Sequence, residues 1–383
     1  MMTVDVPASE PLEDLAIAAD PLIENESLTP NLVALQQNYG PRPLPLFLDL
    51  IARECGGDAA RVAAVMAGLR AFESAKRTRP RGQAPIIARA GRTCLRDYGG
   101  SGPPLIFVPS LINPPTVLDL IEGHSLLLWM AGQGFHVLLV DWGTPDADER
   151  NLDIGGHVTE HLLPLLASLG EPPLLAGYCL GGTMAMAAAV LAPVRALALI
   201  ASPWNFAGFP GAARTDQASL WRAAQSSANR LGLMPMEILQ SGFWRLDPAR
   251  TVGKYAEFAA MEAGSARALR FIAVEDWAND GPPLTYAAAR EAFEDFFGSN
   301  VTGTGAWRVG GTIINPARLT CPTLDIISTV DRIVPAASAS GLPNRLILAL
   351  GHVGMIVGSK APERLWQPLA DFLLRYSDTD YTI

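Results

Sequence analysis

From residue 104 onward, short apolar runs alternate with longer segments of helical periodicity. Runs such as Leu105–Val108 and Leu197–Ile200 are continuously apolar, which is typical of strands that are buried on both faces. The alternation predicts an α/β fold with a mostly parallel sheet and helices on both of its faces. The expected strands are Pro104–Val108, His136–Asp141, Pro173–Gly177, Ala196–Ala201, Thr323–Ser328 and Arg345–Leu350. The expected helices are Thr116–Ala131, Ile154–Ser168, Leu180–Leu191 and Pro362–Tyr376.

Two parts of the chain break this rhythm. Residues 1–30 are acidic and rich in Ala and Pro and are expected to form a poorly ordered leader, and residues 31–90 form an N-terminal segment with two helices. The α/β core is expected at 91–205 and 316–383. Between them, 206–315 carry helical segments such as Ser219–Leu231 and Lys254–Asp276, which we interpret as a cap over the active-site end of the sheet.

Composition narrows the class of protein. The 383 residues are 49% hydrophobic and carry a net charge of −9, so the chain can bury a large core and offers no broad basic surface for nucleic acid. No apolar stretch is long enough to cross a membrane. The four cysteines are scattered without a CxxC pair, which argues against a zinc site and a disulfide framework and favours a cytoplasmic protein.

A glycine-flanked cysteine lies between one expected strand and the next helix. Gly177, Gly181 and Gly182 surround Cys179, at a place where a tight turn would leave room only for small neighbours. This arrangement resembles the nucleophile elbow of α/β-hydrolases, with cysteine where serine is usual. A buried structural cysteine is the alternative interpretation, and the three glycines favour a nucleophile.

A cysteine nucleophile needs a base and an acceptor that orients the base. In the α/β-hydrolase chain order, acid and histidine follow the nucleophile. Asp331 follows the strand Thr323–Ser328, and His352 follows the strand Arg345–Leu350. The competing interpretation of Asp331 is a turn residue, and Asp141 is an alternative acid.

For other residues near the expected site, the sequence indicates a functional role less clearly. His157 and His161 lie one helical turn apart, but without further metal-ligand context we expect them to pack structurally, and we expect no metal. The oxyanion is expected to bind the backbone N–H of Leu180 and that of Leu111 or Ile112. Asn113 is equally well interpreted as a turn residue before proline or as a catalytic residue.

Taken together, these motifs resemble the polyhydroxyalkanoate synthase family. The similar stretches are Gly177–Thr183, Val108–Asn113, Ser125–Met130, Asp141–Trp142 and Gly351–Lys360, within a region of similarity from about Tyr98 to Phe372. The resemblance implies an acyltransferase that takes 3-hydroxyacyl-CoA onto Cys179, releases CoA and transfers the acyl group to a growing polyester. It also implies His352 as general base and Asp331 as its partner or as the activator of the hydroxyl.

Further expectations accompany this resemblance. Asn113, Tyr178 and Trp277 are expected to contact the substrate, and no cofactor is expected beyond the CoA of the substrate itself. The implied partners are a polyester granule and either a second copy of the chain or a second synthase subunit, in the cytoplasm or at the granule.

The chain also departs from that family. Arg332 stands where the family has histidine after the aspartate, and the segment around Glu275–Gly281 only partly matches. These departures weaken the expectation of polymerisation more than that of an acyl-enzyme. A hydrolase on the same scaffold, either a thioesterase or a polyester depolymerase, is the first alternative, and a non-catalytic granule-associated protein is the second.

Overall fold

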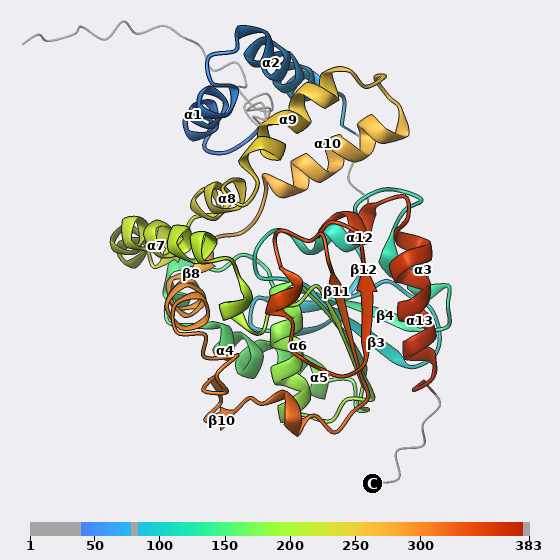
Figure 1. Cartoon of the computed structure of the whole chain (residues 1–383). Helices are drawn as coiled ribbons and strands as arrows, with labels where there is room; N and C mark the ends of the chain where they lie inside the picture. The colour runs from blue at the N-terminus through green and yellow to red at the C-terminus, as the bar shows by residue number, and fades with distance from the viewer. Residues whose placement is uncertain (1–39, 78–82, 378–383) are drawn as a thin grey trace, which may run out of the picture. The chain divides into compact units, whose positions relative to one another are not determined.

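A computed structural model describes residues 40–77 and 83–377 of the chain. Its main feature is an eight-stranded sheet (Figure 1). In spatial order the strands are β1 (Ile86–Ala90), β2 (Thr93–Asp97), β4 (His136–Asp141), β3 (Pro104–Val108), β5 (Leu174–Tyr178), β6 (Ala196–Ile200), β11 (Thr323–Ser328) and β12 (Arg345–Leu348). Only the β1–β2 and β2–β4 pairs of this sheet are antiparallel, which confirms the mostly parallel sheet.

The central strands are buried on both faces, and successive residues enter opposite hydrophobic clusters. In β3, Ile106 and Val108 pack into one cluster, while Leu105 and Phe107 pack into the other. This alternation follows from the period-2 geometry of a strand. The continuous apolar run is therefore the sequence signature of a strand covered on both sides.

Helices cover both faces of the sheet (Figure 1). One face carries α4 (Ile154–Gly156), the π-helical turn His157–Leu162, α5 (Leu163–Ala167) and α6 (Leu180–Leu191). The other face carries α3 (Leu126–Ala131), α12 (Gly354–Val357), the π-helical turn Pro362–Trp366 and α13 (Gln367–Leu374). The expectation that helices cover both faces of the sheet is confirmed.

The insertion after β6 is helical, and its parts pack in two different places. Its elements include α7 (Gly211–Leu231), β7 (Leu233–Met234), α8 (Met236–Trp244), α9 (Pro248–Ala259), α10 (Ala266–Ala278), β8 (Leu284–Thr285), α11 (Tyr286–Arg290), the π-helix Glu291–Gly298, β9 (Arg308–Val309) and β10 (Thr312–Ile313). Residues of α7, α11 and the π-helix extend the α6-side cluster of the core. In contrast, α9 and α10 contribute to a separate hydrophobic cluster.

The N-terminal helices α1 (Leu44–Cys55) and α2 (Ala59–Ser74) complete this separate cluster. The Phe47 ring packs edge-on against Trp244 and Tyr255, with centroids 5.1 and 5.4 Å apart. A Cβ added to Gly68 would lie 1.8 Å from the Tyr255 carbonyl oxygen, so glycine allows α2 to approach α9 closely. Both N-terminal helices are thus joined to the insertion by a hydrophobic core of their own.

Several elements differ from the sequence predictions. The single helix expected over 116–131 is a 3-10 turn, Pro115–Asp119, followed by α3, which Ser125 caps by accepting from the Leu128 N–H. The helical segment expected over 254–276 is divided between α9 and α10. The β1–β2 hairpin was not predicted, and β1 lies inside the range 31–90 that was expected to be helical. The expected leader, 1–30, lies outside the described residues.

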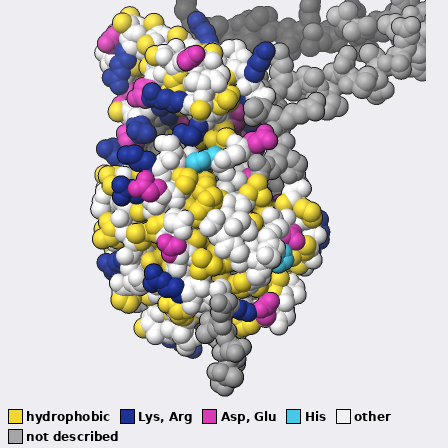
Figure 2. Space-filling model, turned by 90° about the vertical axis from the view of Figure 1, so that its right-hand side faces the viewer, with side chains coloured by type: hydrophobic (Ala, Val, Ile, Leu, Met, Phe, Trp, Pro, Cys, Tyr) yellow, Lys and Arg dark blue, Asp and Glu magenta, His cyan; other side chains and the backbone are white. Residues whose placement is uncertain are grey.

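The surface carries charges of both signs. On the face drawn in Figure 2, Lys and Arg side chains are interspersed with Asp and Glu over the upper part, which α1, α2, α9 and α10 form, and hydrophobic side chains are more frequent below. In residues 40–77 and 83–377, no helix combines the length and the apolar character that a membrane crossing requires.

Candidate active site

Cys179 lies in a strained turn between the end of β5 and the start of α6. Its backbone has φ 56° and ψ −132°, a conformation that non-glycine residues rarely adopt. The Cys179 N–H donates to the Ile200 carbonyl oxygen at 2.9 Å, which ties the turn to β6. The side chain is partly exposed, at the N-terminal end of α6.

The glycines of this turn are needed for close packing. A Cβ on Gly181 would lie 2.1 Å from the Val108 carbonyl oxygen, and one on Gly182 would lie 1.7 Å from Ser202 Oγ. Neither glycine has a positive φ, so the cysteine alone carries the backbone strain of the turn. The expected elbow geometry is present, and the glycines let the ends of β3 and β6 approach it.

Asp331 and His352 lie together in the loops that follow β11 and β12. Nδ1 of His352 is 2.7 Å from Oδ2 of Asp331, and both side chains are buried. Oδ1 of Asp331 accepts the backbone N–H groups of Ile333 and Val334, at 2.8 and 3.0 Å. The carboxylate is therefore held in place from its own loop while it orients the imidazole.

The His352 imidazole lies between this carboxylate and Cys179. Burial by itself lowers the pKa of His352, but Cys179 and Asp331, through charge and hydrogen bonding, outweigh burial and raise the pKa to about 10. An imidazole that is stabilised in its protonated form can pair with a thiolate. The structure thus brings together the three residues that the sequence singled out.

Ser328 holds the loop that carries the histidine, and the sequence analysis did not identify it. The Ser328 hydroxyl donates to the Leu350 carbonyl oxygen at 2.6 Å, two residues before His352. Its position at the end of β11, beside the loop after the neighbouring parallel strand, is the signal that could have pointed to it.

The loop after β3 lies against the elbow, as the Gly181 contact shows. The Trp142 indole N–H donates to the Pro109 carbonyl oxygen at 3.0 Å and anchors the loop. The Ile112 N–H donates to Ser110 Oγ at 3.0 Å, within the loop itself. No hydrogen bond is formed by the Leu111 N–H within the described part of the chain. Of the two loop residues considered for the oxyanion, Leu111 is therefore the one with an available donor.

Asn113 and Trp277 join this loop to the insertion. The Asn113 amide donates to the carbonyl oxygens of Ala278 and Asp280, at 3.3 and 3.1 Å, and its φ is 65°. The Trp277 indole N–H donates to the Pro114 carbonyl oxygen at 2.8 Å. Both polar groups that were expected to contact substrate are engaged in holding the end of α10 against the loop after β3.

Tyr178 is also engaged within the protein. Its ring stacks on the His352 imidazole, and its side chain is buried, with a relative exposure of 3%. The structure thus places Tyr178 beneath the histidine, where the sequence analysis had expected a substrate contact.

Arg332 and Asp141 lie in other interactions. The Arg332 guanidinium is 2.9 Å from Asp247 Oδ2, at the start of α9, and its side chain is largely exposed. Asp141 is 2.6 Å from Arg96 Nε and also accepts the Gly143 N–H. The histidine is therefore oriented by Asp331 and not by the alternative acid, and Arg332 reaches the insertion.

The remaining histidine pair is structural. Nδ1 of His157 is 2.7 Å from the Asp153 carbonyl oxygen, and Nδ1 of His161 is 2.6 Å from the Ala90 carbonyl oxygen. Burial lowers the pKa of His157 to about 3, so it is neutral at physiological pH. Residues 40–77 and 83–377 contain no group of three His, Cys, Asp or Glu side chains arranged to hold a metal ion.

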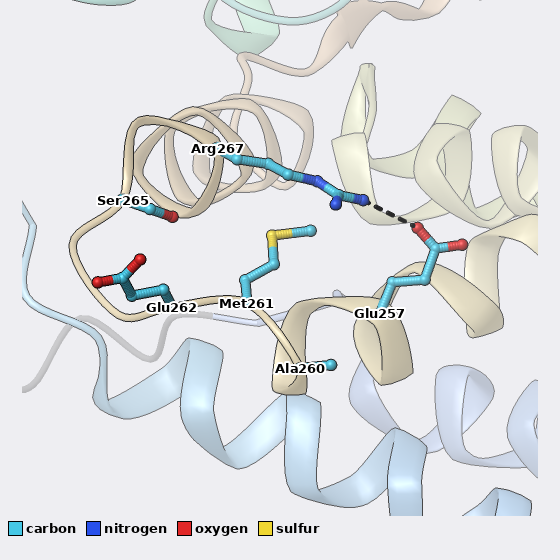
Figure 3. A pocket seen from close by; sticks show the side chains of 6 residues that line it. All are labelled: Glu257, Ala260, Met261, Glu262, Ser265 and Arg267. Atoms are coloured by element: carbon cyan, nitrogen blue, oxygen red, sulfur yellow. Dashed lines mark ion pairs between the residues drawn. The ribbon is translucent and has the colours of Figure 1, made fainter.

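A separate cavity of about 430 Å³ lies at the turn between α9 and α10 (Figure 3). Arg267 forms a 3.8 Å ion pair with Glu257 across it, and both side chains are mostly exposed. Its other lining residues are Ala260, Met261, Glu262 and Ser265. None of the expected site residues lines this cavity.

Comparison with known proteins shows which proteins the chain is similar to. The chain is 28% identical over 293 residues to the poly(3-hydroxyalkanoate) polymerase subunit PhaC of Haloferax mediterranei, a match that covers 72% of this chain and 59% of that protein. It is 27% identical to the subunit of the same name from Synechocystis, with 70% and 77% covered. A solved esterase from Thermogutta terrifontis has 19% identity and a TM-score of 0.42, and covers 78% of this chain with all of its own length.

The match with the first of these relatives spans less than two thirds of that relative's length. A family model described as the alpha/beta hydrolase family matches residues 99–367, which include the elbow, the acid and the histidine. This region is also the one that contains all the parallel strands of the sheet. The chain therefore belongs to the alpha/beta hydrolase family.

Proposed function

We propose that this protein is a polyhydroxyalkanoate synthase-like acyltransferase that takes 3-hydroxyacyl-CoA through an acyl-enzyme on Cys179. The observation that carries the proposal is a cysteine at the elbow, next to a buried histidine whose other nitrogen is 2.7 Å from a buried carboxylate. The similarity to PhaC polymerase subunits supports the substrate class and the polyester product.

In the first half-reaction, the Cys179 thiolate attacks the thioester carbonyl carbon. The carbonyl oxygen becomes an oxyanion that the N–H groups of Leu180 and Leu111 stabilise. The bond between the acyl carbon and the CoA sulfur then breaks, and the His352 imidazolium gives its proton to the departing CoA thiolate. The products are free CoA and a new thioester on Cys179.

In the second half-reaction, the hydroxyl end of an acyl chain attacks this thioester. His352 takes the hydroxyl proton as general base, an ester bond forms, and Cys179 leaves as thiolate beside the imidazolium. Asp331 orients the imidazole and stabilises its positive charge throughout. Both oxygens of Asp331 already have partners, which supports a role as the partner of His352 over direct activation of the hydroxyl.

The residues around the site supply the rest of the proposal. Asn113 and Trp277 hold α10 over the loop that provides Leu111, which would restrict water near the acyl-enzyme. The chemistry needs no cofactor beyond the CoA of the substrate. A polyester granule and a second subunit, or a second copy of the chain, are the partners we propose, and the cytoplasm or the granule surface is the proposed location.

Purified protein supplied with 3-hydroxybutyryl-CoA tests the proposal. Release of free CoA together with insoluble polymer supports the synthase. Release of CoA with free 3-hydroxybutyrate instead identifies a hydrolase, since water and an alcohol would use the same three residues. No release of CoA, with or without a PhaC-type partner subunit present, rejects both enzymes and leaves the non-catalytic alternative.

A further inference from the structure

We infer that Tyr178 is a positioning residue, which fixes the plane of the His352 imidazole beside Cys179. This inference rests on the proposed function, because it assigns a role within the same site. It differs from the substrate contact that the sequence suggested. It also explains why a buried aromatic residue stands directly before the nucleophile.

Tyr178 contacts His352 at two separate points. Its ring stacks on the imidazole with centroids 5.0 Å apart and an interplanar angle of 26°. Its hydroxyl donates to the main-chain carbonyl oxygen of the same histidine at 3.3 Å. Tyr178 therefore restrains both the side chain and the backbone of His352.

The support beneath this contact is rigid, because Tyr178 is the last residue of β5. It pairs in register with Ile200 of β6, and the next residue, Cys179, donates its N–H to the carbonyl oxygen of that same Ile200. His352, in contrast, lies in the loop between β12 and α12. The stacked pair thus connects the strand that carries the nucleophile to the loop that carries the base.

The stack complements the hydrogen bond that the His352 imidazole donates to the carboxylate. Asp331 holds Nδ1 and leaves Nε2 as the nitrogen that can serve Cys179. A single hydrogen bond still allows the ring to tilt about it. The flat face of Tyr178 removes this freedom, so the two contacts together define the direction of Nε2.

The arrangement is unsuited to substrate binding. The Tyr178 side chain is almost wholly buried, and its hydroxyl already donates to a protein carbonyl. Burial, with Cys179 and Asp331 nearby, raises the pKa of this hydroxyl well above its ordinary value, so the group stays protonated and keeps donating.

The test measures the rate of Cys179 alkylation by iodoacetamide against pH in the purified full-length protein. Tyr178→Leu removes the ring, and Tyr178→Phe removes only the hydroxyl. At pH 7 we expect alkylation of the Leu variant to fall by about tenfold, because an imidazole that can tilt away no longer pairs with the thiolate that reacts. The Phe variant keeps the stack but loses the hydrogen bond to the His352 backbone, so we expect it to show a smaller fall than the Leu variant.

Phe135→Leu is the matched control, because Phe135 is a fully buried ring in the same hydrophobic cluster without a ring contact to His352. Thermal unfolding verifies that each variant is folded. If Tyr178→Leu does not fold, Tyr178→Met takes its place as a variant that lacks the ring and fills more of the vacated space. An unchanged profile for a folded variant that lacks the ring would overturn the inference. A Phe variant that falls as far as the Leu variant would also overturn it, because the hydroxyl and not the stack would then hold His352.

The same alkylation experiment distinguishes a failure of the proposed function from a failure of the role inferred for Tyr178. If wild-type Cys179 is alkylated no faster than Cys55, Cys94 and Cys321, the nucleophile itself is wrong. If wild-type Cys179 is fast and the Leu variant is equally fast, only the role of Tyr178 is wrong. With 3-hydroxybutyryl-CoA as substrate, Tyr178→Leu is expected to lower kcat with little change in KM if Tyr178 is a positioning residue. If Tyr178 contacted the substrate, the same substitution would raise KM.

Discussion

His352 Nδ1 lies 2.7 Å from Asp331 Oδ2, and the other oxygen of that carboxylate accepts two backbone N–H groups. These contacts bring together two loops that are 21 residues apart in the chain. They also leave the far nitrogen of the imidazole as the one available for the neighbouring cysteine.

Removing the base is expected to remove most of the turnover. His352→Gln should lower kcat for CoA release by about 10²- to 10⁴-fold, the usual contribution of a general acid or base. His136→Gln is a suitable control, because His136 lies at the first residue of β4, where it pairs with Asp97. Equal activities of the two variants would argue against His352 as the base.

Asp331→Asn should also lower kcat while leaving the fold largely intact, because asparagine keeps an oxygen that can accept the loop N–H groups. The charge that helps to raise the pKa of His352 would be lost, so its pKa should fall. The pH dependence of CoA release checks this shift. Wild-type kcat in the variant would show that the carboxylate does not orient the base.

The raised pKa of His352 in the wild-type protein also predicts how the free energy of unfolding changes with pH. Because the folded pKa of His352, about 10, exceeds its ordinary value of 6.5, the folded state holds this proton more tightly than the unfolded state. The resulting stabilisation is fully present below pH 6.5 and is lost as pH rises to 10. Urea unfolding should therefore show the free-energy difference between wild type and His352→Gln shrinking across this interval, and a constant difference would contradict the shift.

The elbow glycines should not tolerate even one methyl group. Gly182→Ala would place its Cβ against Ser202 and is expected to cost about 1–3 kcal/mol of unfolding free energy, as overpacking does. Gly253→Ala is the matched control, because Gly253 lies within α9 with no atom within 4 Å of an added Cβ. The control should gain up to about 1 kcal/mol from its higher helix propensity. Equal stabilities of the two variants would contradict the close packing at the elbow.

Arg332, which departs from the pattern of the synthases, is expected to matter little for catalysis. Its guanidinium is largely exposed and faces Asp247, so Arg332→Ala should cost no more than the ~0.2–1 kcal/mol typical of a surface pair. Steady-state CoA release should remain close to that of the wild type. A loss as large as that in Asp331→Asn would show that Arg332 takes part in the site.

The sequence predicts the parallel core well, and it singles out three residues that the structure brings together, for clear physical reasons. Strands buried on both faces must be continuously apolar, as β3 is, and sites in open α/β sheets form after the carboxyl ends of such strands. Cys179, Asp331 and His352 all occupy such positions.

Other features depend on tertiary contacts that no local pattern reports. In the β1–β2 hairpin, buried and exposed positions do not alternate regularly, because one end of the hairpin is exposed. Its apolar and polar residues therefore show only a weak period-2 pattern. Nothing local to Asn113 or Trp277 shows that each would hydrogen-bond to the carbonyl oxygens of the other's segment. The sequence around Tyr178 does not indicate a special role, because its contact is with His352, a residue far away in the chain.

The central claim is that the thioester acylates Cys179, and rapid-quench mass spectrometry tests it most directly. Protein mixed with 3-hydroxybutyryl-CoA and quenched in acid should carry a hydroxybutyryl group on the peptide that contains Cys179, with one CoA released per acyl group. Cys179→Ala should show neither the adduct nor CoA release. Undiminished CoA release by Cys179→Ala, or an acyl group found on another residue, would contradict the account.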